Sequence, residues 1–301
     1  YATDASAYRE RPIGVVYPKD SHDLKIILKF CIENEIAMIP RAAGTSLAGQ
    51  VVGNGLIVDI SKYMTKILEI NVQERWARVE PGVIRDELNR VLAKEGLFFA
   101  PETSTSNRCM IGGMLGNNSC GANSLVFGSV RDHTLSVNAI LHDGSEVVFE
   151  NLSNEEFVKK TLLNNTEGDI YRHINELLSD EEMSKEIRKQ FPDPSTKRRN
   201  TGFALDILNE MKPFNPQGSP FNFSGLIAGS EGTLCLITEI KVNLEPLPPK
   251  NKGLLCVHLN SVEEALHANL IALKYKPFSV ELMDSEILQL TKDNIEQRKN
   301  R

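Results

Sequence analysis

The sequence lacks both a concentration of positive charge and a long apolar run. Its 301 residues carry 34 lysines and arginines against 40 aspartates and glutamates, which gives a net charge of −6. Nucleic-acid binding requires a concentrated basic surface that displaces counterions, so we expect no nucleic-acid partner. No apolar stretch approaches the ~18 residues that cross a bilayer, and we expect no membrane span. The apolar fraction of 41% is instead typical of a globular protein.

Closely spaced cysteines are missing too. The chain has five cysteines, and the nearest two, Cys109 and Cys120, are eleven positions apart. This spacing excludes a CxxC motif, a disulfide framework and a run of cysteines that would hold an iron–sulfur cluster. Reduced thiols favour a cytoplasmic protein, with peripheral attachment to a membrane left open.

Common nucleotide and metal motifs are also absent. No G-x-G-x-x-G follows a predicted strand, and no GxxxxGK precedes a serine or threonine, which excludes a Rossmann dinucleotide site and a P-loop nucleotidase. The histidines are scattered, with no i, i+4 pair and no metal-ligand spacing, so we predict no metal site and assign no catalytic residue. They are His22, His133, His142, His173, His258 and His267.

The residues at both ends of the sequence indicate that it is part of a longer protein. Tyr1 is not an initiator methionine, and no charged-then-apolar signal follows it. Residues 293–301 are highly charged and come directly after helix-like and strand-like patterns. We expect further chain beyond residue 301.

Residues 1–61 alternate between strand and helix patterns. Short apolar strands are expected at Gly14–Tyr17, Ala37–Ile39 and Leu56–Ile60. Ser21 is expected to cap a helix in which apolar residues recur at i, i+3, i+4 and i+7. A helix between apolar strands predicts parallel neighbours joined by a right-handed crossover, and so a small βαβ subdomain.

Alternating patterns then predict antiparallel strands. Lys66–Ile70 and Arg75–Glu80 form one expected pair. Leu135–Leu141 and Glu146–Phe149 form another around Asp143-Gly144, whose residue types favour a tight hairpin turn.

Polar helices interrupt this sheet at Asn151–Phe191, within an insertion that we place at 151–222. Leu234–Leu244 predicts a long strand, which the following prolines end because proline cannot donate to a ladder. We therefore assign 62–248 to a second, larger subdomain with a mainly antiparallel sheet and helices. The predicted fold class of 1–248 is α+β, with two α/β subdomains.

Residues 249–301 predict the beginning of another domain. Ser261 and Glu264 form a capping box for a helix, and Ser279–Met283 alternates like a strand. The domain is expected to be truncated in this chain.

The first of three glycine-rich stretches is Pro40-Arg41-Ala42-Ala43-Gly44-Thr45-Ser46-Leu47-Ala48-Gly49. Small residues allow backbone N–H groups to turn inward, and the hydroxyls of Thr45 and Ser46 add donors. Fixed dipoles of this kind suit a diphosphate, while a tight surface turn explains the same residues equally well.

The second stretch, Thr103–Gly121, concentrates hydroxyls and amides beside Gly112-Gly113. The side chains of Asn117 and Asn118 can bond ligand hydroxyls or phosphate oxygens. A purely structural loop rarely gathers so many glycines and amides, which favours a ligand here.

The third stretch, Gly229–Leu234, opens directly into a strand. Glu231 can bond a ribose hydroxyl, while the strand covers an adenine by backbone contacts. Donor-rich loops without a P-loop lysine indicate a bound cofactor rather than a phosphate that is transferred. The basic run Lys197-Arg198-Arg199 indicates a solvated loop more than a site for a substrate carboxylate.

Taken in order, these stretches resemble the PCMH-type FAD-binding domain of the vanillyl-alcohol oxidase and para-cresol methylhydroxylase family. The resemblance covers about residues 1–248. Each motif is modest alone, but the ordered set is highly specific. The motifs are Tyr1-x-x-Asp4-x-Ser6, Arg41-x-x-Gly44-Thr45-Ser46-Leu47, Ile111-Gly112-Gly113 with Asn117–Gly121, and Gly229–Leu234 with Ile237-Thr238-Glu239.

Within that family the chain is most similar to the FAD-linked D-lactate, glycolate and D-2-hydroxyglutarate dehydrogenases. Asn107–Met114 and Arg198–Asp206 resemble the large members in particular, which carry an iron–sulfur region after the flavoprotein part. This likeness bears only on a portion outside the present chain. The resemblance also implies that residues 249–301 begin a substrate-binding cap domain.

The resemblance implies a role for each stretch. The first would cradle the pyrophosphate, the second would line the ribityl chain, phosphates and isoalloxazine edge, and the third would hold the adenosine end. The cofactor-binding residues carried over in this way are Pro40, Arg41, Ala42, Ala43, Gly44, Thr45, Ser46, Leu47, Ser104, Thr105, Ser106, Asn107, Cys109, Met110, Gly113, Asn117, Asn118, Ser119, Gly121, Glu231, Gly232, Leu236 and Ile237.

This sequence departs from the family pattern at a few positions. Thr45 stands where some relatives attach FAD through a histidine, so the resemblance implies a non-covalent flavin. Ala42 and Ala43 stand where glycines are common, which narrows the space for the phosphates. Cys235 also stands where the family often has glycine.

The implied reaction is removal of a hydride from the α-carbon of a 2-hydroxy acid to flavin N5, while a base takes the hydroxyl proton. Related dehydrogenases hold that base, a metal and the substrate carboxylate in the cap. We therefore expect an incomplete enzyme with an unknown electron acceptor. Two alternatives remain, a cofactor-holding module without redox activity and a flavin reductase that acts on an enolpyruvyl group.

Overall fold

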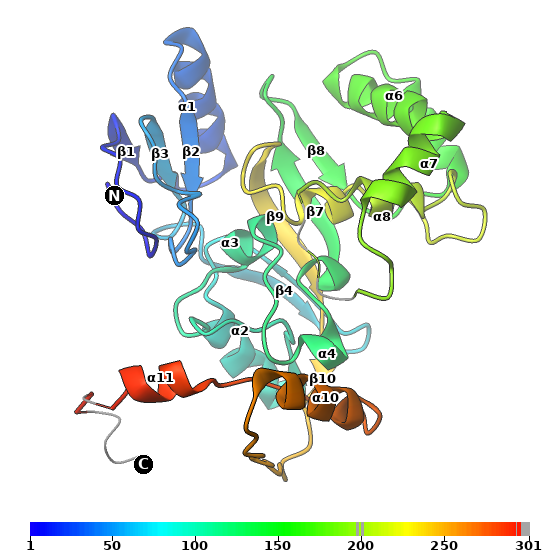
Figure 1. Ribbon diagram of the computed structural model, residues 1–301. Helices are drawn as coiled ribbons and strands as arrows, with labels where there is room; N and C mark the ends of the chain where they lie inside the picture. Colours follow the sequence, from blue (N-terminus) through cyan, green and yellow to red (C-terminus); the bar gives the residue numbers. More distant parts are fainter. Residues whose placement is uncertain (197–198, 200–201, 293, 296–301) are drawn as a thin grey trace.

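The two larger sheets lie side by side, with the three-stranded one formed by the N-terminal part of the chain (Figure 1). The computed structural model describes residues 1–196, 199, 202–292, 294 and 295. A mixed architecture with one parallel and one larger antiparallel sheet confirms the predicted α+β class.

The smaller sheet has the order β1-β3-β2, with β1 at Gly14–Val16, β2 at Met38–Arg41 and β3 at Leu56–Asp59. Both pairings are parallel, as predicted. Helix α1 (Ser21–Glu33) connects β1 to β2 and buries one apolar stripe. Its N-cap is Asp20 rather than the predicted Ser21, because the Asp20 carboxylate accepts the backbone N–H of Asp23.

The larger sheet is antiparallel throughout and has the order β4-β5-β9-β7-β8. Its strands are β4 (Ile67–Asn71), β5 (Trp76–Val79), β7 (Thr134–Ile140), β8 (Glu146–Phe149) and β9 (Leu236–Asn243). The predicted strand pairs are therefore confirmed. The last strand in the chain to join this sheet lies at its centre, so the third glycine-rich stretch is delivered to the middle of the fold.

The predicted hairpin between β7 and β8 is present, but its turn spans His142, Asp143 and Gly144 instead of having Asp143-Gly144 as its central pair, because the backbone N–H of Gly144 donates to Leu141 O. Gly144 has φ +86°, and a Cβ atom added there would have no heavy atom within 4 Å. The Asp143 carboxylate accepts hydrogen bonds from the backbone N–H and the hydroxyl of Ser145. Glycine is needed at this turn for its backbone conformation and not for space.

Helices α2 (Arg85–Leu92) and α3 (Ile111–Gly116) supply buried side chains to the main core, which also contains the inward residues of β5, β7 and β9. Because β9 and α3 share this core, the second and third stretches are held at fixed positions relative to each other. Short elements complete this region: η1 (Ala93–Glu95), β6 (Leu97–Phe98), α4 (Ser124–Phe127) and η2 (Arg131–His133).

The helical insertion lies at the opposite side of the large sheet from the small sheet (Figure 1). It contains α5 (Asn154–Thr161), α6 (Thr166–Ser179), α7 (Glu181–Gln190) and α8 (Leu205–Asn209), and α9 (Ser224–Ile227) follows it. The polar helices predicted at 151–191 are thus confirmed. A cluster of edge-to-face aromatic rings anchors them, formed by Phe157, Tyr171, Phe214, Phe221 and Phe223.

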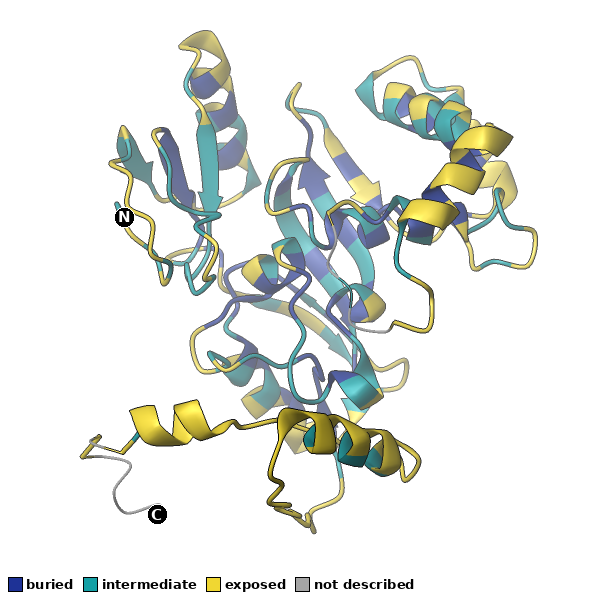
Figure 2. Ribbon diagram, in the orientation of Figure 1, coloured by how far each residue is buried: buried dark blue, intermediate teal, exposed yellow. Residues whose placement is uncertain are grey.

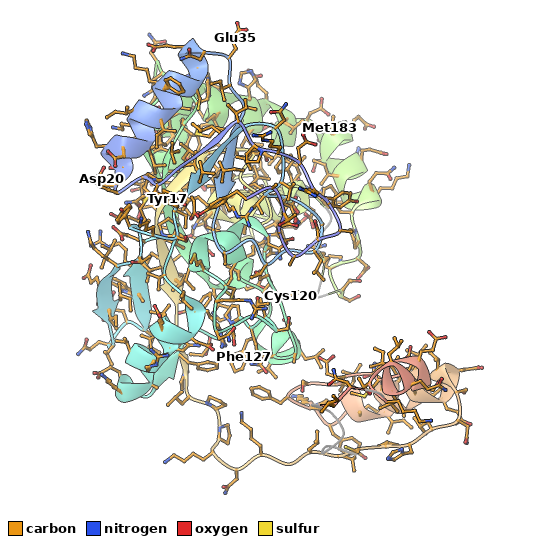
Figure 3. The ribbon with its side chains drawn as sticks, turned by 90° about the vertical axis from the view of Figure 1, so that its left-hand side faces the viewer. Tyr17, Asp20, Glu35, Cys120, Phe127 and Met183 are labelled. Carbon is orange, nitrogen blue, oxygen red and sulfur yellow. The ribbon has the colours of Figure 1, made fainter. Side chains whose placement is uncertain are left out.

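The C-terminal segment runs apart from the body and is largely exposed (Figure 2). After β10 (Glu245–Pro246), which pairs with β6, it contains α10 (Val262–Leu273) and α11 (Ser285–Leu290). Ser261 caps α10 as predicted, but the capping box is not closed, because the Glu264 carboxylate accepts the backbone N–H of Asn260 and not that of Ser261. Phe278 meets Phe127, which is labelled in Figure 3, at 5.5 Å between ring centroids.

The strand predicted at Ser279–Met283 is wrong, because these residues form neither helix nor strand. An alternating pattern becomes a strand only beside a partner that satisfies its backbone, and none of the described strands pairs with it. Across the described residues, no helix has the length and apolar character to cross a bilayer.

Candidate functional site

A cleft of about 690 Å³ contains residues from all three glycine-rich stretches. Its floor is apolar, and it includes Leu24 of α1, Val58 of β3 and Leu236 of β9. These three side chains belong to one small buried cluster that joins the two sheets. The cleft therefore lies where the small sheet meets the large one.

The first stretch leaves β2 at Arg41 and turns through Gly44, where φ is +64°. In the described structure, none of the backbone N–H groups from 43 to 48 donates a hydrogen bond to a protein acceptor. These residues line the cleft. A run of amides without protein acceptors in a concave surface is a site for an anion such as a phosphate.

Arg41 lines the cleft but is engaged with the N-terminal residues. Its guanidinium donates to the carbonyl oxygens of Thr3 at 3.1 Å and Tyr1 at 3.4 Å. The same group lies 5.1 Å from the centre of the Tyr1 ring. Arg41 therefore secures the chain start against the first stretch.

The second stretch approaches the first through Gly113. A Cβ atom at Gly113 would lie 3.1 Å from the Ala42 methyl, and one at Gly112 would lie 2.5 Å from Pro81. The absence of a side chain at Gly113 therefore leaves room for Ala42, the position where relatives often have glycine.

The third stretch lies against the end of α3. The backbone N–H of Glu231 donates to Gly116 O at 2.9 Å, and that of Gly229 donates to Leu115 O at 3.0 Å. Gly232 has φ +76°, and a Cβ atom there would lie 2.6 Å from Pro40 Cγ. Only glycine permits this approach between the third stretch and the first.

A side-chain hydrogen bond also crosses the cleft. Gln50 Nε2 donates to Glu231 Oε1 at 3.2 Å, and Ser46 Oγ donates to Gln50 Oε1. Gln50 comes directly after the first stretch. A polar side chain next to Gly49 is the only feature of the sequence that indicates a role for Gln50 in the cleft. Lys25 and Glu146 also join the two sheets through an exposed ion pair, with 2.9 Å between Nζ and Oε1. Neither residue lines the cleft.

Most of the predicted cofactor-binding residues line this cleft, but three do not: Ser106, Asn107 and Asn118. Ser106 Oγ donates to Asp86 Oδ2, and Asn107 Oδ1 accepts from Arg108. Asn118 is fully buried, and its Oδ1 accepts the backbone N–H of Arg131. In this structure they support the second stretch and do not face the cleft.

Several further residues line the cleft. Those that lie inside the first two stretches but were not named individually are Ala48, Thr103, Arg108, Gly112, Met114, Gly116 and Cys120. The others neighbour the motifs or are apolar residues of the floor, which have no distinguishing pattern, and they are Ala5, Leu24, Gln50, Val51, Val58, Ile60, Pro81 and Cys235.

Burial keeps two of the thiols in the cleft protonated, and a protonated thiol is a poor nucleophile. Burial raises the pKa of Cys235 to about 12, and burial also raises the pKa of Cys109 despite the hydrogen bond from Thr103. Cys120, labelled in Figure 3, lines the cleft as well and is half-buried. All five cysteines are free.

Other candidate groups lie away from the cleft. His133 is buried, with Nε2 2.8 Å from Phe127 O. Lys197 and Arg198 of the basic run lie outside the described residues, and Arg199 pairs with Asp206 at 2.6 Å. Among the described residues no group of three histidine, cysteine or carboxylate side chains is placed to hold a metal ion.

Part of this chain matches a known protein family. Residues 12–150 match the family described as "FAD binding domain". The chain therefore contains an FAD-binding domain of this family. The matched range includes the first and second stretches, and the third completes the same cleft.

Curated relatives of the FAD-binding chain match it almost end to end. D-2-hydroxyglutarate dehydrogenase of Pseudomonas putida is 35% identical over 98% of this chain and 28% of the relative. The Escherichia coli enzyme of the same name is 36% identical with the same coverage. Glycolate oxidase subunit GlcD of Bacillus subtilis is 29% identical over 97% of this chain and 50% of the relative. The chain thus spans about a quarter of the length of the two dehydrogenases.

A solved structure of alkyldihydroxyacetonephosphate synthase has the same fold. It superposes with a TM-score of 0.50 and 17% identity, and covers 78% of this chain and 34% of the synthase. At that identity the likeness concerns the fold alone.

The cleft residues fit FAD. A volume of about 690 Å³ lies within the range typical of cofactor sites. The amides from 43 to 48 supply donors for a diphosphate. Among the described lining residues Glu231 is the only carboxylate, so little negative charge opposes a diphosphate. One oxygen of Glu231 accepts a hydrogen bond from Gln50.

Gln50→Ala is expected to speed release of FAD about threefold to tenfold, because one neutral hydrogen bond across the cleft is lost. Lys25→Met is the matched control, since it removes an ion pair that joins the two sheets outside the cleft. Stopped-flow measurement of flavin release into excess apoflavoprotein gives the rate. Equal acceleration by both variants would show that the Gln50 contact has no specific effect on the cofactor.

Proposed function

We propose that this chain is the FAD-binding part of a dehydrogenase that oxidises a 2-hydroxy acid, with FAD held non-covalently in the cleft. The observation that carries the proposal is the run of amides from 43 to 48, which have no protein acceptors in the described structure and lie within the residues that match an FAD-binding family. The relatives named for D-2-hydroxyglutarate and glycolate support the substrate class.

Each stretch has a proposed task. The amides of 43–48 and the hydroxyls of Thr45 and Ser46 would bind the pyrophosphate. Ser104, Thr105, Asn117 and Ser119 would bond the ribityl chain and the ring edge, because their polar side chains line the cleft.

The third stretch has a different proposed task. Glu231 would accept a hydrogen bond from an adenosine hydroxyl, next to its contact with Gln50. Leu236 and Ile237 would cover the adenine from β9. Residues 1–61 and 62–248 would act as two subdomains that enclose the cofactor between them.

When bound, FAD supplies a hydride acceptor at N5. The described residues would hold and orient it, and Leu24, Val58 and Leu236 would provide an apolar surface against it. No described histidine lines the cleft, so we propose that the base which takes the hydroxyl proton comes from chain that follows residue 248. A cytoplasmic location and an iron–sulfur region elsewhere in the protein remain part of this proposal.

FAD titration of the purified chain tests the proposal. We expect quenching of flavin fluorescence with a Kd of about 1 µM or tighter, and a visible spectrum at wavelengths of about 350 to 500 nm. After acid precipitation the flavin should remain in the supernatant, as expected for non-covalent binding. Absence of binding after reconstitution with FAD would overturn the proposal, and flavin in the pellet would overturn its non-covalent part.

Activity is tested in the full-length protein. Anaerobic addition of D-2-hydroxyglutarate, D-lactate or glycolate should bleach the flavin absorbance for at least one substrate. A cofactor-holding module without redox activity is the second candidate, favoured by the lack of a described histidine in the cleft. FAD binding without bleaching by any 2-hydroxy acid would support that module instead.

A further inference from the structure

Arg131 lies outside the cleft lining but bonds the backbone just before the third stretch. Its Nε donates to Gly225 O at 2.8 Å, and a terminal guanidinium nitrogen donates to Ala228 O at 2.6 Å. These carbonyls belong to α9 and its C-terminal end, which lead directly into Gly229. A single planar guanidinium therefore sets the point from which the third stretch departs.

The same residue is tied to the second stretch. The backbone N–H of Arg131 donates to Asn118 Oδ1 at 2.9 Å. Asn118 is fully buried and adopts φ +44°, a conformation that costs energy for a residue other than glycine. Arg131 consequently links the second stretch, through Asn118, to the backbone that leads into the third stretch, and it does so without lining the cleft.

The close fit around Gly229 strengthens this arrangement. Gly229 has φ +95°, and a Cβ atom there would lie 3.1 Å from the Arg131 guanidinium. Toward α3, the third stretch is held by the backbone bonds to Leu115 O and Gly116 O. The stretch is therefore clamped between α3 and Arg131.

Charged groups surround the guanidinium. Burial lowers the pKa of Arg131, while Asp206 and Asp132 act in the opposite sense and Arg199 adds to the lowering. Asp206 comes from α8 of the helical insertion and also pairs with Arg199. Arginine remains charged under all ordinary conditions, and lysine cannot reproduce its two donors in a fixed plane.

We propose that Arg131 is a positioning residue for FAD, which holds the third stretch in the place where Glu231 and Gly232 complete the cleft. It acts through the carbonyls of Gly225 and Ala228 and touches neither FAD nor substrate. This inference rests on the proposed cofactor site. Arg131 does not line the cleft and belongs to none of the sequence motifs.

Arg131→Lys and Arg131→Gln test the inference, and Arg172→Lys is the matched control. Arg172 also donates to two backbone carbonyls, Thr161 O at 2.7 Å and Leu163 O at 2.6 Å, but it lies in the helical insertion. When the Arg131 charge is removed, the Asp206 carboxylate keeps a cationic partner, because Arg199 still pairs with it. Both Arg131 variants are therefore expected to fold.

The readouts are the Kd for FAD, the visible circular dichroism of bound flavin, and the melting temperature of the apo form. We expect the Arg131 variants to bind FAD about 10- to 100-fold more weakly, with altered flavin dichroism, and Arg172→Lys to bind within about twofold of wild type. Melting temperatures of Arg131→Lys and Arg172→Lys should fall by similar amounts.

The outcomes separate the two proposals. If wild type fails to bind FAD, the cofactor proposal itself is overturned. If wild type binds and the Arg131 variants lose no more affinity than Arg172→Lys, the positioning role is overturned. If an Arg131 variant is unfolded at about 25 °C while Arg172→Lys is folded, a purely structural role is established and the inference is also rejected.

Discussion

Replacing Gly232 by alanine is expected to weaken FAD binding by more than about 100-fold, which corresponds to roughly 2.7 kcal/mol. The new methyl would lie 2.6 Å from Pro40 Cγ, and a proline ring cannot move aside as a flexible side chain does. The third stretch would have to shift away from the first. Such a shift would move Glu231 and the start of β9 together, and would open the end of the cleft at which we propose the adenosine binds.

Gly144→Ala is the matched control for this variant. Gly144 has φ +86°, close to the +76° of Gly232, but no heavy atom within 4 Å of an added Cβ. It should cost about 1 kcal/mol of stability from backbone conformation alone and leave the Kd for FAD unchanged. The two variants thus separate backbone strain from the contact with Pro40. Wild-type FAD affinity in Gly232→Ala would contradict the proposed closeness of the first and third stretches.

Phe221→Ala is expected to lower the free energy of unfolding by about 3–5 kcal/mol. Phe221 is fully buried, and its ring centre lies 4.7 Å from that of Phe157 and 4.9 Å from that of Phe223. Its backbone also bridges to Leu152 beside β8. Truncation would leave a cavity at the point where the helical insertion meets the large sheet.

Tyr171→Phe provides a contrast within the same aromatic cluster. The Tyr171 hydroxyl is buried and has no hydrogen-bond partner among the described residues, so its removal should be neutral or slightly stabilising. Urea unfolding measures both variants through their midpoints and slopes. FAD affinity should stay unchanged in both, because neither residue lines the cleft. A loss below about 1 kcal/mol for Phe221→Ala would show that the insertion is not anchored through this cluster.

Local features of the fold could be predicted because their causes are local. Asp143-Gly144 indicated the hairpin, and the alternation in Leu234–Leu244 indicated β9. Where a local pattern needed a distant partner, the prediction failed, as at Ser279–Met283, which has no described strand beside it. The cap of α1 was misplaced by one residue because aspartate and serine are equally good acceptors at that position.

The site shows the same division between local and distant causes. Glycines, hydroxyls and amides marked the three stretches, since a chain that presents backbone donors to a ligand needs small residues. Asn118 has the same side chain as its neighbour Asn117, yet it turns into the core toward Arg131. Residue type alone does not reveal which of two adjacent amides faces a cleft.

Composition and local pattern were therefore enough to predict the α+β class, the order of most elements and the donor-rich character of the cofactor-binding stretches. The tertiary structure alone decided which of their atoms meet. Gln50 contacts Glu231 from 181 positions away, Gly232 passes the ring of Pro40, and Arg131 holds the carbonyls of Gly225 and Ala228. Contacts at such separations depend on how the two sheets pack, and packing is a property of the whole buried core that no short segment encodes.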